Sequence, residues 1–405
     1  MKPFTIGLIR EGKSPPDKRD PLTPAQCREL LDTYPSVTLL VQSSPIRIYT
    51  DDEYRKAGIP VTEEMSECDI LLGVKEVPID HLIPGKTYLF FSHTIKEQPY
   101  NRPLLQAVLE KRIRLIDYEC LTDTDGIRMI GFGRYAGIVG AYNGLIGYGK
   151  RTGRFDLKPA HQCIQMSEMK EELEKIEFGT IKIVITGRGR VGRGAREVMK
   201  VAGFRNVTPE DFLTRHFQFP AFCQLGGKHY NIHTDGQRHT EEHFYDHPSE
   251  YTSAFLPYVQ TSDLFISCHY WDPQAPRLFT IEDLNNPSFS VQVIADITCD
   301  IEGSIPTTVA PTTIEDPFYG YNRRSHQKDE PFQEDSITVM AVDNLPCEVP
   351  RDASEGFGKE FVQKVLPLLI KEDPEKIIEK AVITLDGKLT DRFQYLSDYV
   401  HSNQD

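Results

Sequence analysis

The first 120 residues alternate between short apolar runs and polar stretches that are compatible with helices. Short runs of apolar and β-branched residues between turn signals predict strands. We expect strands at Phe4–Ile9, Ser36–Val41, Ile70–Val74, Thr87–Phe91 and Arg114–Asp117. We expect helices within Thr23–Thr33, Asp51–Ala57 and Asn101–Lys111. This alternation indicates βαβ units, and therefore a first α/β domain built on a mostly parallel sheet.

The same pattern starts again in the second half of the chain. An apolar run, Ile183–Thr186, leads into a glycine-rich turn and then into a helical stretch that begins near Arg196. Further strands are expected at Asn206–Pro209, Asp263–Tyr270, Val291–Ile297 and Ser336–Val342. Between them, residues 210–260 are polar and rich in turn residues, which predicts a solvated, irregular insertion.

Two further stretches complete the expected organisation. Residues Gly131–Gly149 are apolar and dense in glycine, which costs helix stability unless close packing compensates, so we expect a buried helix that connects two domains. A helical tail from Glu355 is expected to pack back on the first domain. The predicted class is α/β, with two Rossmann-like domains and parallel sheets separated by a cleft. The first domain would cover residues 1–133 and 340–405, and the second 134–339 with the insertion at 210–260.

Composition narrows the classes of function. The 405 residues are too many for one ordinary core, and their net charge of −14 argues against nucleic-acid binding. Nothing approaches the ~18 consecutive apolar residues that a membrane span needs. The eight cysteines form no C-x-x-C pair, so we expect reduced thiols and a cytoplasmic location. The oligomeric state stays open.

The glycine turn predicts a dinucleotide site. Gly187, Gly189 and Gly192 have the spacing G-x-G-x-x-G and stand between a strand and a helix, which is the context that this fingerprint requires. The first glycine allows a tight turn, the second allows backbone to approach a pyrophosphate, and the third allows close packing of helix on strand. Arg188, Arg190 and Val191 lie in the same turn.

Histidines raise a second possibility, a metal site. Six of the twelve histidines fall between His216 and His247, and His229 and His233 stand four residues apart. The spacing is loose and no cysteine pair supports it, so we favour a solvated insertion and expect no metal.

In the first domain, titratable side chains follow two predicted strands. Lys75 and Glu76 come after one strand, and His93 and Lys96 come after the next. Open parallel sheets bind ligands at the carboxyl ends of their strands. A lysine lifted out of water near another cation becomes a usable base, and histidine titrates near neutrality, so the pair would supply two acid–base groups. Taken singly, each is more typical of a surface residue at a strand end, and their matched placement is what makes a functional role equally plausible.

Other charged residues add to this picture. Arg19 precedes Pro21-Leu-Thr-Pro24, Glu119 follows Ile116-Asp-Tyr, and Arg128 follows a turn at Asp125-Gly126. Cations that face a site in an acidic protein suggest an anionic substrate such as a carboxylate, which arginine binds with two hydrogen bonds.

Several of these stretches resemble one family. They are Phe90-Phe-Ser-His-Thr-Ile-Lys96, Leu115-Ile-Asp-Tyr-Glu119, Gly131-Phe-Gly-Arg-Tyr-Ala-Gly137, Asp246-His-Pro-Ser-Glu-Tyr251, Tyr270-Trp-Asp-Pro-Gln-Ala-Pro-Arg-Leu278, Thr312-Thr-Ile-Glu-Asp-Pro-Phe318, Asp343-Asn-Leu-Pro346 and Asp352-Ala-Ser-Glu355. They are similar to the lysine–2-oxoglutarate reductase domain of the bifunctional aminoadipic semialdehyde synthases of animals and plants. More distantly, the chain resembles lysine-forming saccharopine dehydrogenase, alanine dehydrogenase and the NAD-binding part of transhydrogenase.

The resemblance implies a reaction and roles for residues. Lysine would condense with 2-oxoglutarate, and hydride from a nicotinamide would reduce the imine to saccharopine. Lys75 matches the family's base and His93 the group that activates water, while Glu76 and Glu119 match carboxylates that tune their charge. The family's substrate-binding cations are matched by Arg19, Lys96 and Arg128.

The cofactor is expected to be NADP or NAD, with a preference for NADP. NAD-binding Rossmann domains usually place an acidic residue at the end of the second strand, where it binds the ribose 2′-hydroxyl. Here Thr208 stands near that position, Arg205 is close by, and Arg188 and Arg190 add positive charge in the glycine turn.

Two alternatives to the reductase stay open. One is alanine dehydrogenase or another amino-acid dehydrogenase of the same superfamily, which would want a tighter pocket than the long 210–260 stretch and Tyr270-Trp271 suggest. The other is a dinucleotide-binding sensor without catalysis, which would be expected to lack Lys75 or His93, although both are present.

Overall fold

The computed structural model describes residues 4–402 and divides the chain into two compact units. The first unit comprises residues 1–131 and 350–405, and the second comprises residues 132–349. Residues 340–349, which we expected in the first domain, pack in the second. Their 3₁₀ turn η9 (Leu345–Glu348) lies against helix α4 (Gly133–Thr152), and Asn143 Nδ2 donates a 2.8 Å hydrogen bond to Glu348 Oε1.

The first unit is built on an eight-stranded sheet of order β18-β17-β6-β5-β4-β1-β2-β3. Its strands are β1 (Phe4–Leu8), β2 (Val37–Gln42), β3 (Val61–Thr62), β4 (Ile70–Leu72), β5 (Thr87–Phe90), β6 (Arg114–Asp117), β17 (Val382–Leu385) and β18 (Lys388–Leu389). From β6 to β3 all neighbours are parallel, as the alternating pattern predicts. The tail from Glu355 packs in the first unit, as predicted, but it is not helical throughout, because β17 pairs antiparallel with β6 and extends the sheet.

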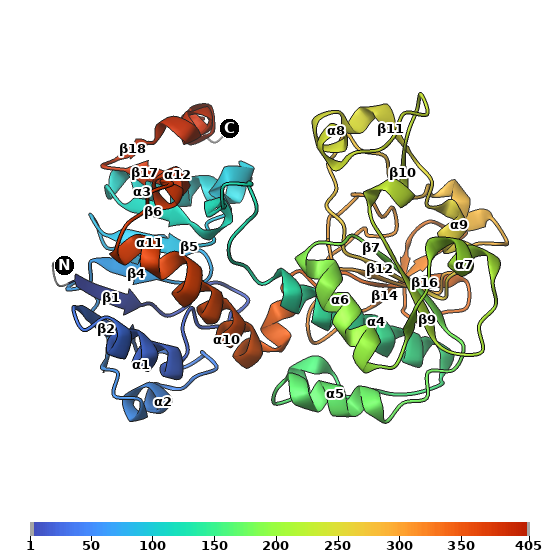
Figure 1. The fold of residues 1–405 in the computed structure, drawn as a ribbon, viewed down its shortest axis with the longest axis horizontal. Helices are drawn as coiled ribbons and strands as arrows, with labels where there is room; N and C mark the ends of the chain where they lie inside the picture. Colours follow the sequence, from blue (N-terminus) through green and yellow to red (C-terminus); the bar gives the residue numbers. More distant parts are fainter. Residues whose placement is uncertain (1–3, 403–405) are drawn as a thin grey trace. The chain divides into compact units, whose positions relative to one another are not determined.

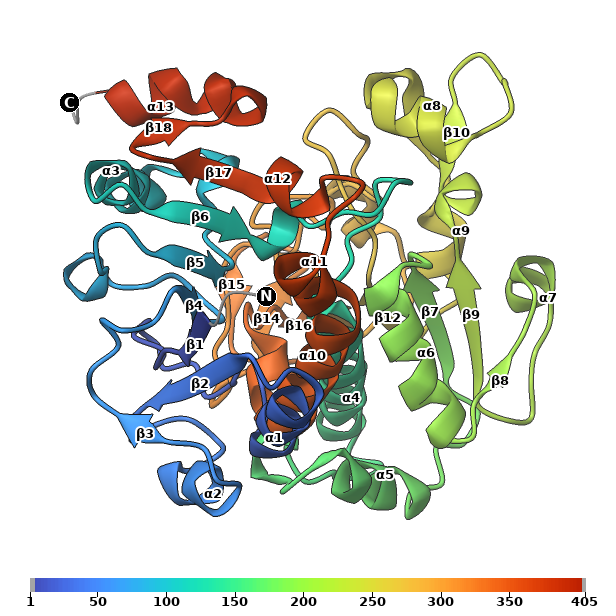
Figure 2. The same cartoon turned by 60° about the vertical axis from the view of Figure 1, so that its left-hand side comes forward.

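The first unit has seven helices within the described residues, and the first three form within the polar stretches that predict them. The helices are α1 (Pro24–Thr33), α2 (Asp51–Lys56), α3 (Arg102–Glu110), α10 (Pro350–Glu360), α11 (Leu366–Ile370), α12 (Ile377–Ala381) and α13 (Ser397–His401). Helix α1 begins at a capping box. Thr23 Oγ1 accepts a hydrogen bond from the Gln26 backbone N–H, and Gln26 Oε1 accepts one from the Thr23 backbone N–H. The early helix α1 packs beside the late helix α10 (Figures 1 and 2). The two chain segments of the first unit therefore form one body.

The second unit holds another eight-stranded sheet, of order β15-β14-β16-β13-β12-β7-β9-β8. Its strands are β7 (Lys182–Thr186), β8 (Arg205–Asn206), β9 (Ala221–Leu225), β12 (Leu264–Ser267), β13 (Val293–Asp296), β14 (Tyr319–Asn322), β15 (Lys328–Asp329) and β16 (Ser336–Met340). From β16 to β8 the neighbours are parallel, while β14 and β15 add an antiparallel edge. The predicted α/β class with two parallel-rich sheets is confirmed.

The stretch 210–260 is not an irregular insertion throughout. Strand β9 lies between β7 and β8 in the sheet, and its side chains Phe222 and Cys223 are fully buried. The expected strand Asn206–Pro209 is shorter than predicted, because β8 ends at Asn206 and Pro209 starts a helix. The remainder of the stretch holds a small antiparallel pair, β10 (Asn231–His233) and β11 (Tyr251–Ser253).

The helices of the second unit are α4, α5 (Met166–Glu174), α6 (Arg190–Val201), α7 (Pro209–Thr214), α8 (Glu241–Asp246) and α9 (Leu256–Val259). Helix α4 is buried along most of its length, as its apolar composition predicts, but it belongs wholly to the second unit and is no connector. It packs closely on α6 (Figure 2). A Cβ on Gly137 would lie 1.9 Å from the carbonyl oxygen of Val191, so this crossing requires glycine.

Two features concern the whole chain. All eight cysteines are free thiols. Among the helices of residues 4–402, none combines the length and apolar character that a membrane span needs.

Candidate functional site

The charged residues predicted in the first domain follow strands that are neighbours in its sheet. Strands β6, β5, β4 and β1 are adjacent and parallel, so the loops that leave their carboxyl ends share one edge. Glu119 follows β6, His93 follows β5, Lys75 and Glu76 follow β4, and Glu11 follows β1. This edge is where open α/β sheets carry their ligand sites.

His93 and Glu76 form the closest pair at this edge. His93 Nδ1 lies 2.5 Å from Glu76 Oε1, and both side chains are largely buried. His93 has a left-handed backbone with φ of 54°, an uncommon conformation for a residue other than glycine. The preceding Ser92 is tied to the next strand, because its backbone N–H donates to Asp117 Oδ2 at 2.9 Å. These contacts fix where the imidazole sits.

The charge of Glu76 decides the tautomer of His93. Burial would raise the pKa of Glu76, but the hydrogen bond and charge of His93, assisted by Lys13, outweigh burial and lower it to about 2. The carboxylate is therefore ionised and accepts the hydrogen bond, so the His93 proton lies on Nδ1. In the neutral form of the ring, the opposite nitrogen, Nε2, has a lone pair that can take a proton.

Lys75 is held beside this pair through its backbone. Its N–H donates to Glu11 Oε2 at 2.8 Å, and the N–H of Val74 donates to Glu11 Oε1 at 2.7 Å. Burial lowers the pKa of the Lys75 ammonium, and the nearby charges of Arg19 and Lys13 lower it further. A lysine in this setting reaches its neutral, basic form at a lower pH than a solvated one.

Three residues of the site were missed by the sequence analysis. Glu11, Lys13 and Asp17 all lie in the loop after β1, where only Arg19 was singled out. Glu11 is 8% exposed, and burial next to Asp17 raises its pKa to about 8. The signal was available, because this loop follows a predicted strand in the same way as the loops that carry Lys75 and His93.

The predicted substrate-binding cations have different settings. Arg19 is buried and donates from Nε and Nη2 to the two carboxylate oxygens of Asp17, at 3.0 and 2.5 Å. Arg128 is exposed and donates from Nη2 to Glu119 Oε1 at 3.0 Å. Lys96 ends the short 3₁₀ turn that follows His93. The positive charge of Arg19 therefore helps to lower the pKa of Lys75, and Arg128 lies with Glu119 at the end of β6.

In the second unit, the glycine turn has the geometry that a dinucleotide site needs. Gly187 follows β7 with φ of 85°, and Gly189 is the N-cap of α6, which begins with Arg190 and Val191. A Cβ on Gly192 would lie 2.3 Å from the carbonyl oxygen of Gly187, while one on Gly189 would meet nothing within 4 Å. The turn is closely packed at Gly192 and open at Gly189, which fits a pyrophosphate bound at the helix N-terminus.

Thr208 lies away from the position that its prediction assumed. It is the N-cap of α7, where its side chain accepts from the Asp211 backbone at 3.1 Å. It follows β8, the outermost strand, whereas the strand that borders β7 is β9. The residues at the end of β9 are Gly226, Gly227, Lys228 and His229, and the Arg188 side chain lies 3.3 Å from a Cβ built on Gly226.

The histidine-rich stretch brings three possible ligands together. His233 Nε2 lies 3.2 Å from Glu250 Oε2, and His243 Nε2 lies 3.8 Å from the same oxygen. However, the Asp235 backbone N–H donates to His233 Nδ1 at 3.1 Å, so the neutral ring carries its proton on Nε2. This proton faces Glu250, where a cation would need a lone pair. The arrangement favours a hydrogen-bonded cluster, and the absence of a metal stays a prediction.

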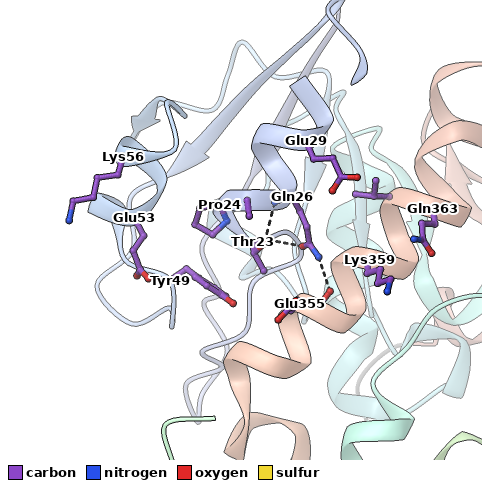
Figure 3. Close-up of a pocket in the computed structure, with 12 residues that line it drawn as sticks. Thr23, Pro24, Gln26, Glu29, Tyr49, Glu53, Lys56, Glu355, Lys359 and Gln363 are labelled. Carbon is purple, nitrogen blue, oxygen red and sulfur yellow. Dashed lines mark hydrogen bonds between the residues drawn. The ribbon is translucent and has the colours of Figure 1, made fainter. Parts of the chain in front are cut away.

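A cavity of the first unit lies apart from this site. It measures about 680 Å³ and is bordered by α1, α2 and α10 (Figure 3). Figure 3 shows Gln26 bonded to Thr23 and to Glu355, and Gln26 Nε2 donates to the Glu355 carbonyl at 2.7 Å. Neither Lys75 nor His93 lines this cavity, so it is separate from the site at the sheet edge.

Comparison with known proteins places this geometry in a family. Residues 7–139 match the model of the alanine dehydrogenase/PNT N-terminal domain, and residues 174–392 match that of the C-terminal domain. The alpha-aminoadipic semialdehyde synthase of Arabidopsis thaliana is 28% identical over 98% of this chain and 42% of its own length. The chain thus spans about half the length of the first curated relatives.

Two further relatives match along most of their length. A saccharopine dehydrogenase of Emericella nidulans, described as NAD(+), L-lysine-forming, is 28% identical over 90% of this chain and 92% of its own. A solved L-alanine dehydrogenase superposes with a TM-score of 0.66 at 17% identity, covering 98% of this chain and all of that chain, which shows a shared fold. Because both family domains match, the chain belongs to the alanine dehydrogenase/PNT family.

Proposed function

We propose that this protein is a lysine–2-oxoglutarate reductase, a saccharopine dehydrogenase of the lysine-forming type. Lysine, 2-oxoglutarate, NAD(P)H and a proton would give saccharopine, NAD(P)⁺ and water, reversibly. The observation that carries this proposal is the placement of a half-buried lysine, Lys75, and a carboxylate-held imidazole, His93, at one sheet edge. The full-length match to a relative described as lysine-forming saccharopine dehydrogenase supports the choice of substrate.

His93 is suited to activate water. In the direction that releases lysine, water must add to the carbon of the imine while a base takes its proton. With Nδ1–H held by Glu76, Nε2 of His93 accepts that proton, and the carboxylate stabilises the imidazolium that results. In the reverse direction the same imidazolium returns the proton to the departing water.

Lys75 is suited to the other proton transfer. Saccharopine is a secondary amine, and its nitrogen must be neutral before hydride can leave the neighbouring carbon. A Lys75 amine with a lowered pKa takes that proton at a pH where a solvated lysine would already be charged. The proton returns from the Lys75 ammonium when the imine is reduced.

The nicotinamide cofactor supplies or accepts the hydride, and the residues that would hold it lie in the second unit. Gly187, Gly189 and Gly192 shape the turn, and the backbone of Arg190 and Val191 opens the helix above it. Arg19, Lys96 and Arg128 are proposed to bind the carboxylates of the substrates, because arginine and lysine are strong donors to carboxylates.

An assay of NAD(P)H oxidation with paired substrates tests the function. It would compare lysine plus 2-oxoglutarate with ammonia plus pyruvate, each with NADH and with NADPH. Turnover confined to lysine and 2-oxoglutarate is expected. Turnover with ammonia and pyruvate would replace the proposal by an alanine dehydrogenase, and absence of turnover with any pair would favour a non-catalytic dinucleotide binder.

Replacing Glu76 with glutamine should lower turnover about tenfold, a part of what a general acid–base group contributes. Glutamine is uncharged and cannot balance the charge of an imidazolium. Its NH₂ group is a donor, and when it faces His93 Nδ1 it favours the tautomer with the proton on Nε2. The charge of Glu76 also raises the pKa of Lys75, so its removal should move the acid limb of saccharopine oxidation to lower pH. An acid limb that stays in place would show that Glu76 does not act on Lys75.

The cofactor is proposed to be NADP rather than NAD. The five residues at the end of β9, Leu225 to His229, include no carboxylate. Arg188 and Lys228 supply two positive charges there against the carboxylate of Glu241, whose Oε1 lies 3.3 Å from a Cβ built on Gly227. Arg188→Ala should raise the KM for NADPH about tenfold, the loss expected for one charged hydrogen bond. The KM for NADH should change less than twofold. Equal losses for both cofactors would mean that Arg188 binds a part that they share.

The partners that we propose are the small-molecule substrates lysine, 2-oxoglutarate and saccharopine. The free cysteines also favour a reducing compartment, and we propose a cytoplasmic location on that basis.

A further inference from the structure

His269 is a buried histidine of the second unit to which the proposed function gives no role. It follows β12, is 6% exposed, and has both ring nitrogens within hydrogen-bond distance of a hydroxyl group. Nδ1 lies 2.8 Å from Thr186 Oγ1, and Nε2 lies 3.0 Å from Ser304 Oγ. Burial lowers the pKa of His269 to about 4, so the ring is neutral near pH 7. The imidazole therefore links two segments of the chain without adding a charge.

The first of these segments leads into the glycine turn. Thr186 is the last residue of β7 and is fully buried, and Gly187 follows it. The chain at His269 lies directly against the turn, because a Cβ on Gly187 would lie 2.5 Å from the Cys268 carbonyl oxygen and 3.0 Å from His269 Cα. The imidazole is thus bonded to the part of the second unit that is proposed to hold the pyrophosphate.

The second segment is the loop between β13 and β14. Its backbone is strained, because Cys299 and Glu302 have φ of 53° and 56°, values that are uncommon in residues other than glycine and that persist only where the surroundings fix them. On one side, the Ser304 carbonyl accepts from the Leu278 N–H at 3.0 Å. On the other side, the Ser304 hydroxyl meets His269. The imidazole is therefore one of the contacts that fix the path of this loop.

The strand order indicates which part of the cofactor the loop would meet. Strands β9 and β8 lie on one side of β7, and β12, β13 and β16 lie on the other. A dinucleotide spans such a switch point, with one mononucleotide on each half of the sheet. Arg188 and Lys228 are proposed to bind the adenosine ribose on the β9 side. The nicotinamide half then falls at the ends of β12 and β13, where the loop begins.

We propose that His269 is a positioning residue that holds the loop after β13 where this loop meets the nicotinamide half of the cofactor. It acts through the Ser304 hydroxyl rather than by contact with the reacting atoms. The inference rests on the proposed function for its cofactor only, and it adds a residue that sets how firmly NAD(P)H is bound.

A matched pair of amides at residue 269 tests this role. The amide of glutamine reaches about as far as Nε2 of histidine, whereas the amide of asparagine reaches only as far as Nδ1. His269→Asn should raise the Kd for NADPH and NADH about tenfold, because a loop without its bond must be ordered when the cofactor binds. Ser304→Ala removes the same bond and should have the same effect, while His269→Gln should stay within threefold of wild type. His216→Asn, at an exposed histidine in the loop before β9, is the control and should bind as wild type does.

Binding of the adenosine half separates positioning from folding. 2′,5′-ADP and AMP lack the nicotinamide half of NADPH and NADH, so their Kd values by calorimetry should stay within twofold in every variant. An unchanged Kd for NADPH and NADH in His269→Asn would overturn the inference. So would equal losses in His269→Asn and His269→Gln, or equal losses for a cofactor and its adenosine half, because each would make His269 a structural residue. A wild type that binds NADPH or NADH without using lysine would remove the proposed reaction and keep this role, and a wild type that binds neither would remove both.

Discussion

Lys75→Met is expected to lower turnover by about 100-fold or more in both directions, the usual range for a general acid–base group. Methionine keeps the length and apolar stem of lysine but cannot hold a proton. The backbone bonds from Val74 and Lys75 to Glu11 do not involve the side chain, so the loop should keep its position. The variant removes a charge whose burial is unfavourable, and its melting temperature should not fall.

Steady-state kinetics and a pH profile check this prediction. For the wild type, saccharopine oxidation should rise with pH as Lys75 loses its proton, with a midpoint below the 10.5 of a solvated lysine, because burial lowers the pKa. That limb should vanish in Lys75→Met. Lys56→Met, an exposed position in α2 beside the cavity of Figure 3, should behave as wild type. A loss of only two- or threefold at Lys75 would remove it from the mechanism.

The site at the sheet edge of the first unit could be predicted because the carboxyl ends of parallel neighbouring strands lie at the same edge of a sheet. Once β4 and β5 are recognised as neighbours, the loops that hold Lys75 and His93 must meet. The contribution of β1 escaped because its loop is longer and contains several charges of both signs. Only the fold shows that Glu11 reaches the backbone of Lys75, 64 residues away.

The second unit shows where local pattern fails. The β9 run, Ala221–Leu225, is short and stands between Pro220 and the pair Gly226-Gly227, so the turn residues around it favour a loop. Burial between β7 and β8 makes it a strand. The error had a consequence for function. Counting strands along the chain predicts the ribose end of the cofactor near Thr208, whereas in the sheet it is β9 that borders β7, and its end carries Lys228 beside Arg188. The position of the ribose stays a prediction. Strand order depends on contacts distant in sequence, which periodicity does not encode.

The glycines of α4 indicate that another helix, α6, approaches this helix closely. Gly137→Ala should destabilise the second unit by about 3 kcal/mol or more, at the upper end of the cost of overpacking. The added Cβ would lie 1.9 Å from the Val191 carbonyl oxygen, a backbone atom that cannot rotate away, so α4 and α6 must separate. The gain in helix propensity, about 1 kcal/mol, does not offset this.

Thermal unfolding with and without NADPH measures the effect of Gly137→Ala. A drop of roughly 6–12 °C is expected for a domain of this size. The added stability that NADPH confers should also shrink, because Val191 belongs to the glycine turn that would hold the cofactor. Gly133→Ala is the matched control on the same helix, since its Cβ would lie 3.3 Å from Arg190 Cβ and 3.4 Å from Val191 Cγ2, contacts that a small shift relieves. If both variants melt together, the helix crossing tolerates a methyl group and the glycine at residue 137 is not needed for packing.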